Sequence, residues 1–188
     1  MKFLTGILVG FFLVGLVVAG YLAAGAYNVA ATDPPSRLES QLATWALNRS
    51  VARRAPVTHN PLPVTPATWR AGLAHYKENC VVCHGAPGVD PAELGQGLNP
   101  SAPDLTLPRV QNRPEGQTFW IISNGIRTTG MPAFSPTHKP EEIWQIVAFV
   151  RHLPELTADE QKALKPGGDG EEHHREADAA AKAPAPHD

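Results

Sequence analysis

The sequence predicts an all-α protein whose chain begins with a membrane-spanning helix. Residues 3–27 carry no charged side chain, and these 25 residues would span roughly 37 Å as a helix, more than the roughly 30 Å hydrocarbon core of a bilayer. No convincing strand pattern is found, and the 19 prolines favour short helices joined by loops. Near the other end, apolar residues recur at the spacing of a helix with one buried face: Ile143, Ile146, Val147, Val150 and Leu153.

The N-terminal segment, residues 1–31, is expected to stay attached as a membrane anchor. A secretory signal has a shorter apolar core, of about 7–15 residues. The alternative is cleavage after Val29-Ala30-Ala31, and both interpretations export the rest of the chain. Lys2, before the helix, agrees with an N-terminus on the inner side. The helix also carries a stripe of small residues that another membrane helix could approach closely: Gly6, Gly10, Gly15, Ala19 and Ala23.

Residues 32–64 are interpreted as a connector that contains one short amphipathic helix over about 36–52. Ser36 and Glu39 have the spacing of a capping box, and Leu38, Leu42 and Trp45 then recur at helical intervals. This helix could lie on the membrane, pack on the soluble domain or touch a partner subunit, and the last two together are favoured. The proline-spaced stretch that follows is expected to be extended.

Residues 65–157 are predicted to form one compact domain. A helix begins at Thr65-Pro66 and runs to about Cys80, because a proline suits the first helical position. A long loop region over 85–112 precedes a second helix at 114–124, and a third helix begins at Pro140. Residues 158–188 are assigned to a disordered tail, since the composition turns to Ala, Pro, Gly, Glu and His.

Composition and motifs exclude several classes of function. The formal charge is −2 and no cluster of Lys and Arg resembles a nucleic-acid footprint. No paired carboxylates or nucleophile–base arrangement can be placed, so the chain is predicted not to be an enzyme and to take no small-molecule substrate. The His173-His174 pair in the tail is interpreted as solvated and incidental.

The chemistry is carried by Cys80-Val81-Val82-Cys83-His84, which includes the only two cysteines of the chain. Cys-x-x-Cys-His is the attachment pattern of c-type haem. Residues three apart on one helical turn project to the same side, so both sulfurs can reach the two vinyl groups of one porphyrin. The next residue, His84, then lies under the ring and can offer an imidazole nitrogen to the iron. One covalently bound haem c is therefore predicted.

Two other uses of the cysteine pair fit less well. A thiol–disulfide motif needs a thioredoxin-like βαβ setting, which the pattern lacks. A structural zinc site needs four ligands, and no second Cys or His pair stands at a suitable spacing.

The second axial ligand of the iron is assigned to Met131. The only other methionine is Met1, and Met131 stands between Gly130 and Pro132, 47 residues after His84. A lone methionine often only fills a core, and four histidines are alternatives, of which His138 is the serious competitor: His59, His75, His138 and His152. With His and Met both bound, the iron would have no open position, so the predicted chemistry is one-electron transfer. A haem peroxidase or sensor would need an open site and is the alternative from another class.

The chain resembles a class I cytochrome c of the small bacterial kind over about residues 66–155. The resemblance rests on Gly72 and Tyr76 before Cys-Val-Val-Cys-His-Gly and on three further runs of sequence: Asn124-Gly125-Ile126, Gly130-Met131-Pro132-Ala133-Phe134, and Glu142-Ile143-Trp144-Gln145-Ile146-Val147. It departs from the family at Lys139-Pro140, where a Ser-Asp-type cap is common.

The resemblance implies that the first and last helices cross closely, with Gly72 facing Trp144. It also implies haem packing by Pro103 and Leu105, and by Trp120 and Ile126 near the distal side. Proteins of this kind occur as single domains and as haem subunits of respiratory complexes.

Two arrangements are therefore open for a domain held at the periplasmic face of the inner membrane, in a respiratory or photosynthetic chain. It could be a haem subunit of a quinol-oxidising complex, terminal oxidase or dehydrogenase, or a tethered shuttle between such complexes. The helical connector and the stripe of small residues favour the subunit.

Overall fold

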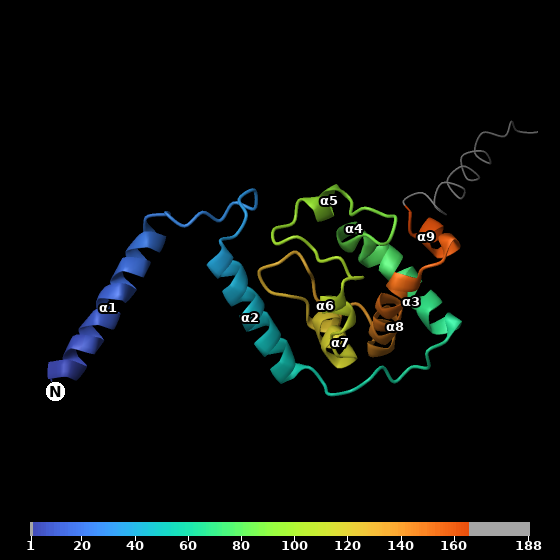
Figure 1. Ribbon diagram of the computed structural model, residues 1–188, viewed down its shortest axis with the longest axis horizontal. Helices are drawn as coiled ribbons and strands as arrows, with labels where there is room; N and C mark the ends of the chain where they lie inside the picture. Colours follow the sequence, from blue (N-terminus) through green and yellow to red (C-terminus); the bar gives the residue numbers. More distant parts are fainter. Residues whose placement is uncertain (1, 166–188) are drawn as a thin grey trace, which may run out of the picture. The chain divides into compact units, whose positions relative to one another are not determined.

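The computed structural model describes residues 2–165, and the chain divides after Pro34 into two units. The described residues contain no strand, only an isolated bridge between Ala86 and Val89. The all-α fold class is thus confirmed (Figure 1). The helices follow in the order α1 (Lys2–Ala23), α2 (Arg37–Arg54), α3 (Pro66–Asn79), α4 (Val81–His84), α5 (Glu93–Gln96), α6 (Pro108–Gln111), α7 (Glu115–Asn124), α8 (Pro140–His152), a 3-10 turn (Leu153–Glu155) and α9 (Ala158–Leu164).

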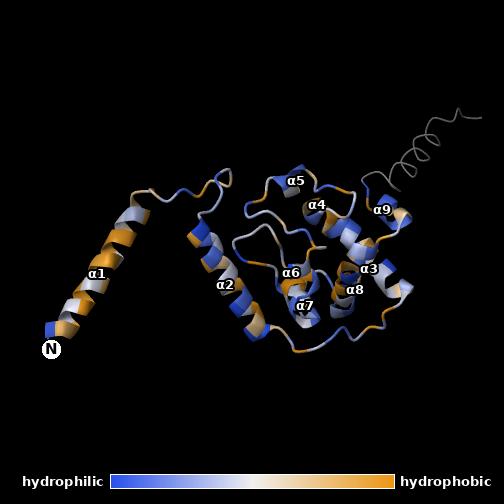
Figure 2. Ribbon diagram, viewed as in Figure 1, coloured by the Kyte–Doolittle hydropathy of each residue, from blue (hydrophilic) through white to orange (hydrophobic). Residues whose placement is uncertain are grey.

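The first unit contains α1, which begins at the charged Lys2 and is mostly apolar from Phe3 onward (Figure 2). Among the described residues, it is the one helix long and apolar enough to cross a membrane, and no part of it is buried in the protein. A signal sequence near an N-terminus can meet the same criteria of length and hydropathy. At the glycines of the small-residue stripe, an added Cβ would have no described residue within 4 Å.

The second unit is organised by the crossing of α3 and α8, which lie against each other in Figure 1. The backbones meet at Gly72, where a Cβ atom would stand 2.1 Å from the carbonyl oxygen of Gln145 and 2.8 Å from the Cβ of Phe149. The predicted close crossing is therefore present, but the prediction that Gly72 faces Trp144 needs correction. The atoms nearest to Gly72 belong to Gln145 and Phe149, whereas the indole of Trp144 stacks on Phe119 at 4.3 Å between ring centroids.

The apolar core lies between α3, α7 and α8. Tyr76 of α3 and Phe149 of α8 are fully buried, with their rings 5.2 Å apart. The apolar face predicted for α8 is buried as a whole. Helix α8 begins at Pro140 despite the absence of a Ser or Asp cap, because the side chain of Glu142 accepts a hydrogen bond from the Lys139 amide at 2.6 Å.

Helix α2 packs on this domain, against α7. Val51 is fully buried, and Arg113 donates to the side chain of Asn48 at 3.1 Å. The helix ends at Arg54, two residues later than predicted, and the amide of Glu39 bonds to Ser36 Oγ at 3.2 Å.

The segment after α2 lies along the domain and contacts it at several residues. A Cβ on Gly116 would stand 2.0 Å from the Pro56 carbonyl oxygen, so the two backbones touch there. The backbone amide of Asn60 donates to the carboxylate of Glu115 at 2.9 Å, and its side-chain Nδ2 donates to the Trp144 carbonyl at 2.8 Å. These contacts reach both α7 and α8.

The predicted end of the domain at residue 157 is too early. Thr157 and Glu160 form a capping box that starts α9, and Leu164 is buried in the core. Glu160 also bonds to the imidazole of His152 at 3.2 Å. The composition alone concealed this short helix because most of its residues are polar and only Leu164 is buried. The disordered tail predicted beyond it, with His173-His174, lies outside the described residues from position 166 onward.

The α3–α8 crossing generates a stability prediction. Gly72→Ala places a methyl group against the rigid backbone of Gln145, so we expect a loss of about 3 kcal/mol in the free energy of unfolding. Gly97→Ala is the matched control, because its added Cβ would have no neighbour closer than 3.6 Å and its φ is −80°. Chemical denaturation followed by circular dichroism measures both. Equal stability of the two variants would contradict the close crossing.

Candidate functional site

The two cysteines lie at the junction of α3 and α4. Cys80 caps the end of α3, and its carbonyl oxygen accepts from the amides of Cys83 at 3.1 Å and His84 at 2.9 Å. One helical turn therefore connects the three residues, as the spacing predicts. Both thiols are unbridged and partly buried.

The environment of Cys80 disfavours a thiol–disulfide role. Burial, and secondarily the neighbouring Cys83, raises the pKa of the Cys80 thiol to about 12. Redox-active cysteines of Cys-x-x-Cys motifs have lowered pKa values, because the thiolate is the reactive form. Such a buried thiol is protonated at neutral pH.

The imidazole of His84 is held by the carbonyl oxygen of Pro103, 2.9 Å from Nδ1. Nδ1 must carry a proton to donate to a carbonyl, so in the neutral ring the lone pair is on Nε2. Burial lowers the pKa of His84, although the bond to Pro103 acts in the opposite direction. A neutral imidazole that donates one N–H to a backbone carbonyl is the usual state of a metal-ligating histidine. These residues thus fit a haem iron at Nε2.

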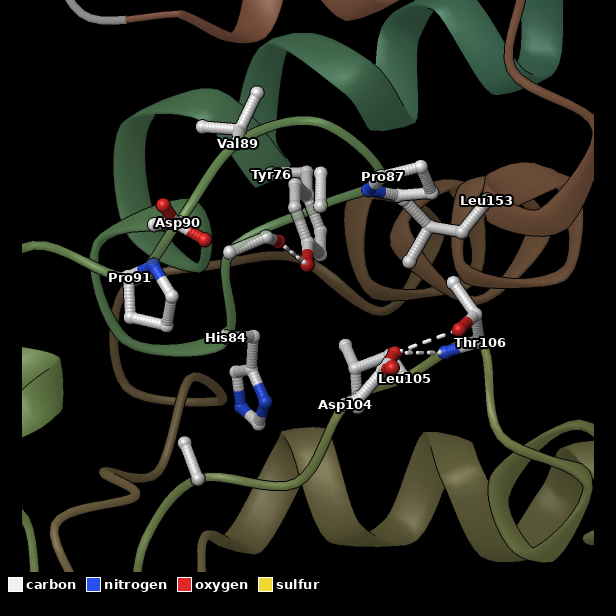
Figure 3. A pocket seen from close by; sticks show the side chains of 13 residues that line it. Tyr76, His84, Pro87, Val89, Asp90, Pro91, Asp104, Leu105, Thr106 and Leu153 are labelled. Carbon is white, nitrogen blue, oxygen red and sulfur yellow. Dashed lines mark hydrogen bonds between the residues drawn. The ribbon is translucent and has the colours of Figure 1, made fainter.

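A cavity of about 340 Å³ adjoins His84 (Figure 3). Its walls come from α3, from the loop after α4 and from residues 102–106. Within it, the Tyr76 hydroxyl donates to the Gly85 carbonyl at 2.6 Å, which ties α3 to the end of α4. Burial raises the pKa of Tyr76, so this hydroxyl stays a donor. Leu105 lines the same cavity, whereas Met131, Trp120 and Ile126 do not.

Met131 lies in a loop fastened to the end of α7. Its carbonyl accepts from the Ile126 amide at 3.2 Å, and its amide donates to the Thr129 hydroxyl at 3.2 Å. Phe134 then donates to the Ile122 carbonyl at 3.1 Å. The half-buried Met131 packs on the same apolar core as Cys80 and Leu105. Hydrogen bonds on both sides thus fix the backbone that carries the thioether.

Gly125 makes this fastening possible. It ends α7 with φ 64° and ψ −173°, a conformation open essentially to glycine alone. A Cβ there would stand 2.6 Å from the Pro132 carbonyl carbon and 2.7 Å from the Met131 carbonyl oxygen.

Each of the four alternative histidines has other contacts. His138 lies edge-on to His75, at 5.3 Å between ring centroids, and its Nδ1 is 2.9 Å from the Thr137 hydroxyl. His152 stacks on Trp69 at 4.6 Å and bonds to Glu160. His59 is 98% exposed and pairs with Glu115 at 3.5 Å. None of these contacts involves the segment of Cys80 and His84.

The other predicted packing residues are distributed over the domain. Pro103 is exposed and contributes its carbonyl to His84, while Leu105 packs on the core. Trp120 and Ile126 are half-buried on α7 and directly after it. Sequence reasoning missed Gly95 of α5, where a Cβ would stand 2.8 Å from the Cα of Cys83. The sequence offered only one signal of this contact, a second glycine close by at Gly97. A close approach of two backbones leaves no periodic pattern in a sequence.

Comparison with known proteins identifies the class of this domain. Residues 67–150 match the family model described as cytochrome c oxidase, cbb3-type, subunit III. A quinohemoprotein alcohol dehydrogenase ADH IIB of Pseudomonas putida is 30% identical over 62% of this chain and 17% of its own length. A quinohemoprotein alcohol dehydrogenase of Comamonas testosteroni is 28% identical over 54% of the chain and 13% of its own. The 1-butanol dehydrogenase (cytochrome c) of Thauera butanivorans is 34% identical over 50% and 12%, respectively.

These findings identify residues 67–150 as a c-type cytochrome domain, a module whose role is electron transfer and whose cofactor is haem c. The predicted resemblance is confirmed, and the domain is a class I cytochrome c. The chain spans less than a fifth of the length of each of these three relatives.

The loop of Met131 generates a second stability prediction. Gly125→Ala should displace this loop, because the new methyl group meets backbone atoms that cannot move independently. We expect a loss of about 3 kcal/mol in the free energy of unfolding and faster hydrogen exchange at the Ile126 amide. Gly88→Ala is the control: its φ of 75° is also positive, but the nearest atom is a glutamine side-chain oxygen at 3.5 Å. If Gly125→Ala and Gly88→Ala lose the same free energy of unfolding, the positive φ alone accounts for the loss and the crowding at Met131 contributes nothing to it.

Proposed function

We propose that this protein transfers single electrons through one haem c bound covalently to Cys80 and Cys83, with His84 and Met131 as axial ligands. The observation that carries the proposal is the bond from His84 Nδ1 to the Pro103 carbonyl, because it leaves Nε2 free on a neutral ring beside both cysteines. When bound, the haem supplies a one-electron Fe(III)/Fe(II) couple.

The residues of this chain would hold that couple in a closed, six-coordinate site. Pro103 fixes the tautomer and orientation of His84, while the hydrogen-bonded loop presents the Met131 thioether. A thioether is a soft ligand and favours the reduced iron, which raises the reduction potential. Leu105, Trp120 and Ile126 would pack on the porphyrin and exclude water. A closed site suits an electron carrier better than an enzyme.

We further propose that α1 anchors the chain in the inner membrane and that the cytochrome domain lies on the periplasmic side. The uncharged length of α1 supports a membrane span. A single haem is proposed because the two cysteines supply one attachment motif. The organisation becomes an anchor over 1–31, a connector over 32–64, and a domain that continues from 65 through α9.

Within a membrane, the protein is proposed to work as a haem subunit of a redox complex, with an oxidase, dehydrogenase or quinol-oxidising complex as partner. The name of the matching family, which is that of an oxidase subunit, supports this arrangement. The packing of α2 and of the segment after it on the domain also supports the subunit arrangement, because a free shuttle benefits from a long flexible tether. A tethered shuttle remains the second candidate.

Covalent attachment is tested by replacing the cysteines. Denatured wild-type protein should keep its haem and show one haem-stained band on a denaturing gel. Cys80→Ala combined with Cys83→Ala should abolish that band, whereas each single variant should keep one thioether and weaker staining. Immunoblotting of the same gel controls for the amount of protein. Release of the haem from the wild-type chain by acid–acetone would refute the attachment.

The axial ligand is tested by Met131→Ala. Loss of the thioether should remove the Fe(III)–methionine charge-transfer band, lower the reduction potential and let carbon monoxide bind the reduced iron. His138→Ala is the control, since its contacts are with His75 and Phe134, and its spectrum should match the wild type. The reverse result, a changed spectrum only for His138→Ala, would transfer the ligand role to that histidine.

A further inference from the structure

Helix α2 has apolar side chains on two opposite sides. The inner side carries Leu47 and Val51, of which Val51 is fully buried against the domain. The outer side carries Leu38, Leu42 and Trp45, at intervals of four and three residues. At about 100° of rotation per residue, Leu47 stands about 160° around the helix from Trp45. The two sides therefore cannot be covered by the same neighbour.

Within the part of the chain that the structure describes, the outer side is uncovered. The side chains of Leu38, Leu42 and Trp45 are 65%, 57% and 62% exposed, respectively. All three belong to a helix that is already docked through its other side. Exposed apolar residues that cluster in this way mark a contact surface more often than scattered ones.

The charges on α2 indicate what kind of surface covers this side. The helix carries four arginines and a single carboxylate, in a chain with a formal charge of −2. Arg49 and Arg53 lie about 40° and 80° from Trp45 and so continue the same face of α2 towards its C-terminal end, while the guanidinium of Arg54 bonds to Ser50. An apolar stripe with a tryptophan, followed by arginines on the same face, suits the headgroup region of an anionic bilayer.

The length of the linking segment sets an upper limit on the distance between the end of α1 and the start of α2. Thirteen residues separate Ala23 from Arg37, which at about 3.5 Å per residue reach at most about 45 Å. If α1 spans the membrane, as proposed above, α2 stays within that distance of the headgroups. A surface helix also needs no partner protein to bury its stripe.

We propose that α2 lies flat on the anionic membrane surface, with Leu38, Leu42 and Trp45 inserted at the lipid interface and Arg49 and Arg53 at lipid phosphates. This inference rests on the proposed anchoring by α1. Because the inner side of α2 is packed on α7, the lipid contact holds the whole cytochrome domain in one orientation to the membrane. The domain is then supported at α2 as well as tethered by α1.

Site-specific photo-crosslinking in the full chain tests this contact. The photoreactive residue p-benzoylphenylalanine replaces Trp45, Leu13 of α1 or, as a control, Ala43, which is exposed about 160° around α2 from Trp45. Each variant is irradiated in cell membranes and in vesicles of phosphatidylcholine with about 30% phosphatidylglycerol, and mass spectrometry identifies the adducts. We expect at least about five times more lipid adduct at 45 than at 43, and several-fold less at 45 after Arg49→Gln with Arg53→Gln.

The outcomes separate this inference from the function on which it rests. If lipid adducts form at position 13 but are no more frequent at position 45 than at the control position 43, the membrane-surface placement of α2 is wrong and the anchoring by α1 still holds. Protein adducts at 45, from a partner or a second copy, also overturn it and assign the stripe to a protein interface. Absence of lipid adducts at 13 removes the anchor itself, whereas haem staining and the methionine spectrum test electron transfer independently.

Discussion

The structure depends on the direct backbone contact between α3 and α8 at Gly72. Only a residue without a side chain lets the carbonyl of Gln145 approach so closely, and that approach brings Tyr76 and Phe149 into one buried layer. Since α3 continues through Cys80 into α4, the crossing also determines where the Cys-x-x-Cys-His turn lies relative to the core. The Tyr76 hydroxyl then ties the end of that turn to α3 through Gly85. The same helix crossing therefore determines both the packing of the core and the position of the candidate site.

The two proposed axial ligands are held by different physical means. His84 is oriented by a single hydrogen bond to a backbone carbonyl, in an environment whose burial keeps the ring neutral. Met131 has no polar group that could be held in this way, so its position follows from its backbone, which Ile126 and Thr129 bind from both sides. Gly125 allows that loop to return against α7. A thioether ligand thus requires an ordered loop, whereas an imidazole ligand requires only an acceptor for its second nitrogen.

The sequence was sufficient to predict the elements that have a local signal. The apolar segment of α1, the proline start of α3, the spacing of α8 and the Cys-Val-Val-Cys-His turn each correspond to structure at the expected positions. Contacts between distant backbones were not predictable, because the approach of Gly95 to Cys83 or of Gly116 to Pro56 leaves no periodicity. Helix α9 was missed although the residues of its capping box are visible in the sequence, because its burial in the core depends on Leu164 alone.

The connector changes how the membrane and the electron-transfer domain can be related. A flexible tether raises the local concentration of a domain but leaves its orientation free. Here the chain from α2 to α3 is bound to the domain at Val51, Pro56 and Asn60, so this part of the connector is fixed on the domain. Orientation matters for electron transfer because an exposed haem edge must face its partner. If α1 spans a membrane, as proposed, a domain fixed to its connector in this way would present one face repeatedly to a partner in the same membrane. This rigidity is a physical reason to favour a fixed haem subunit over a shuttle that must turn between donor and acceptor.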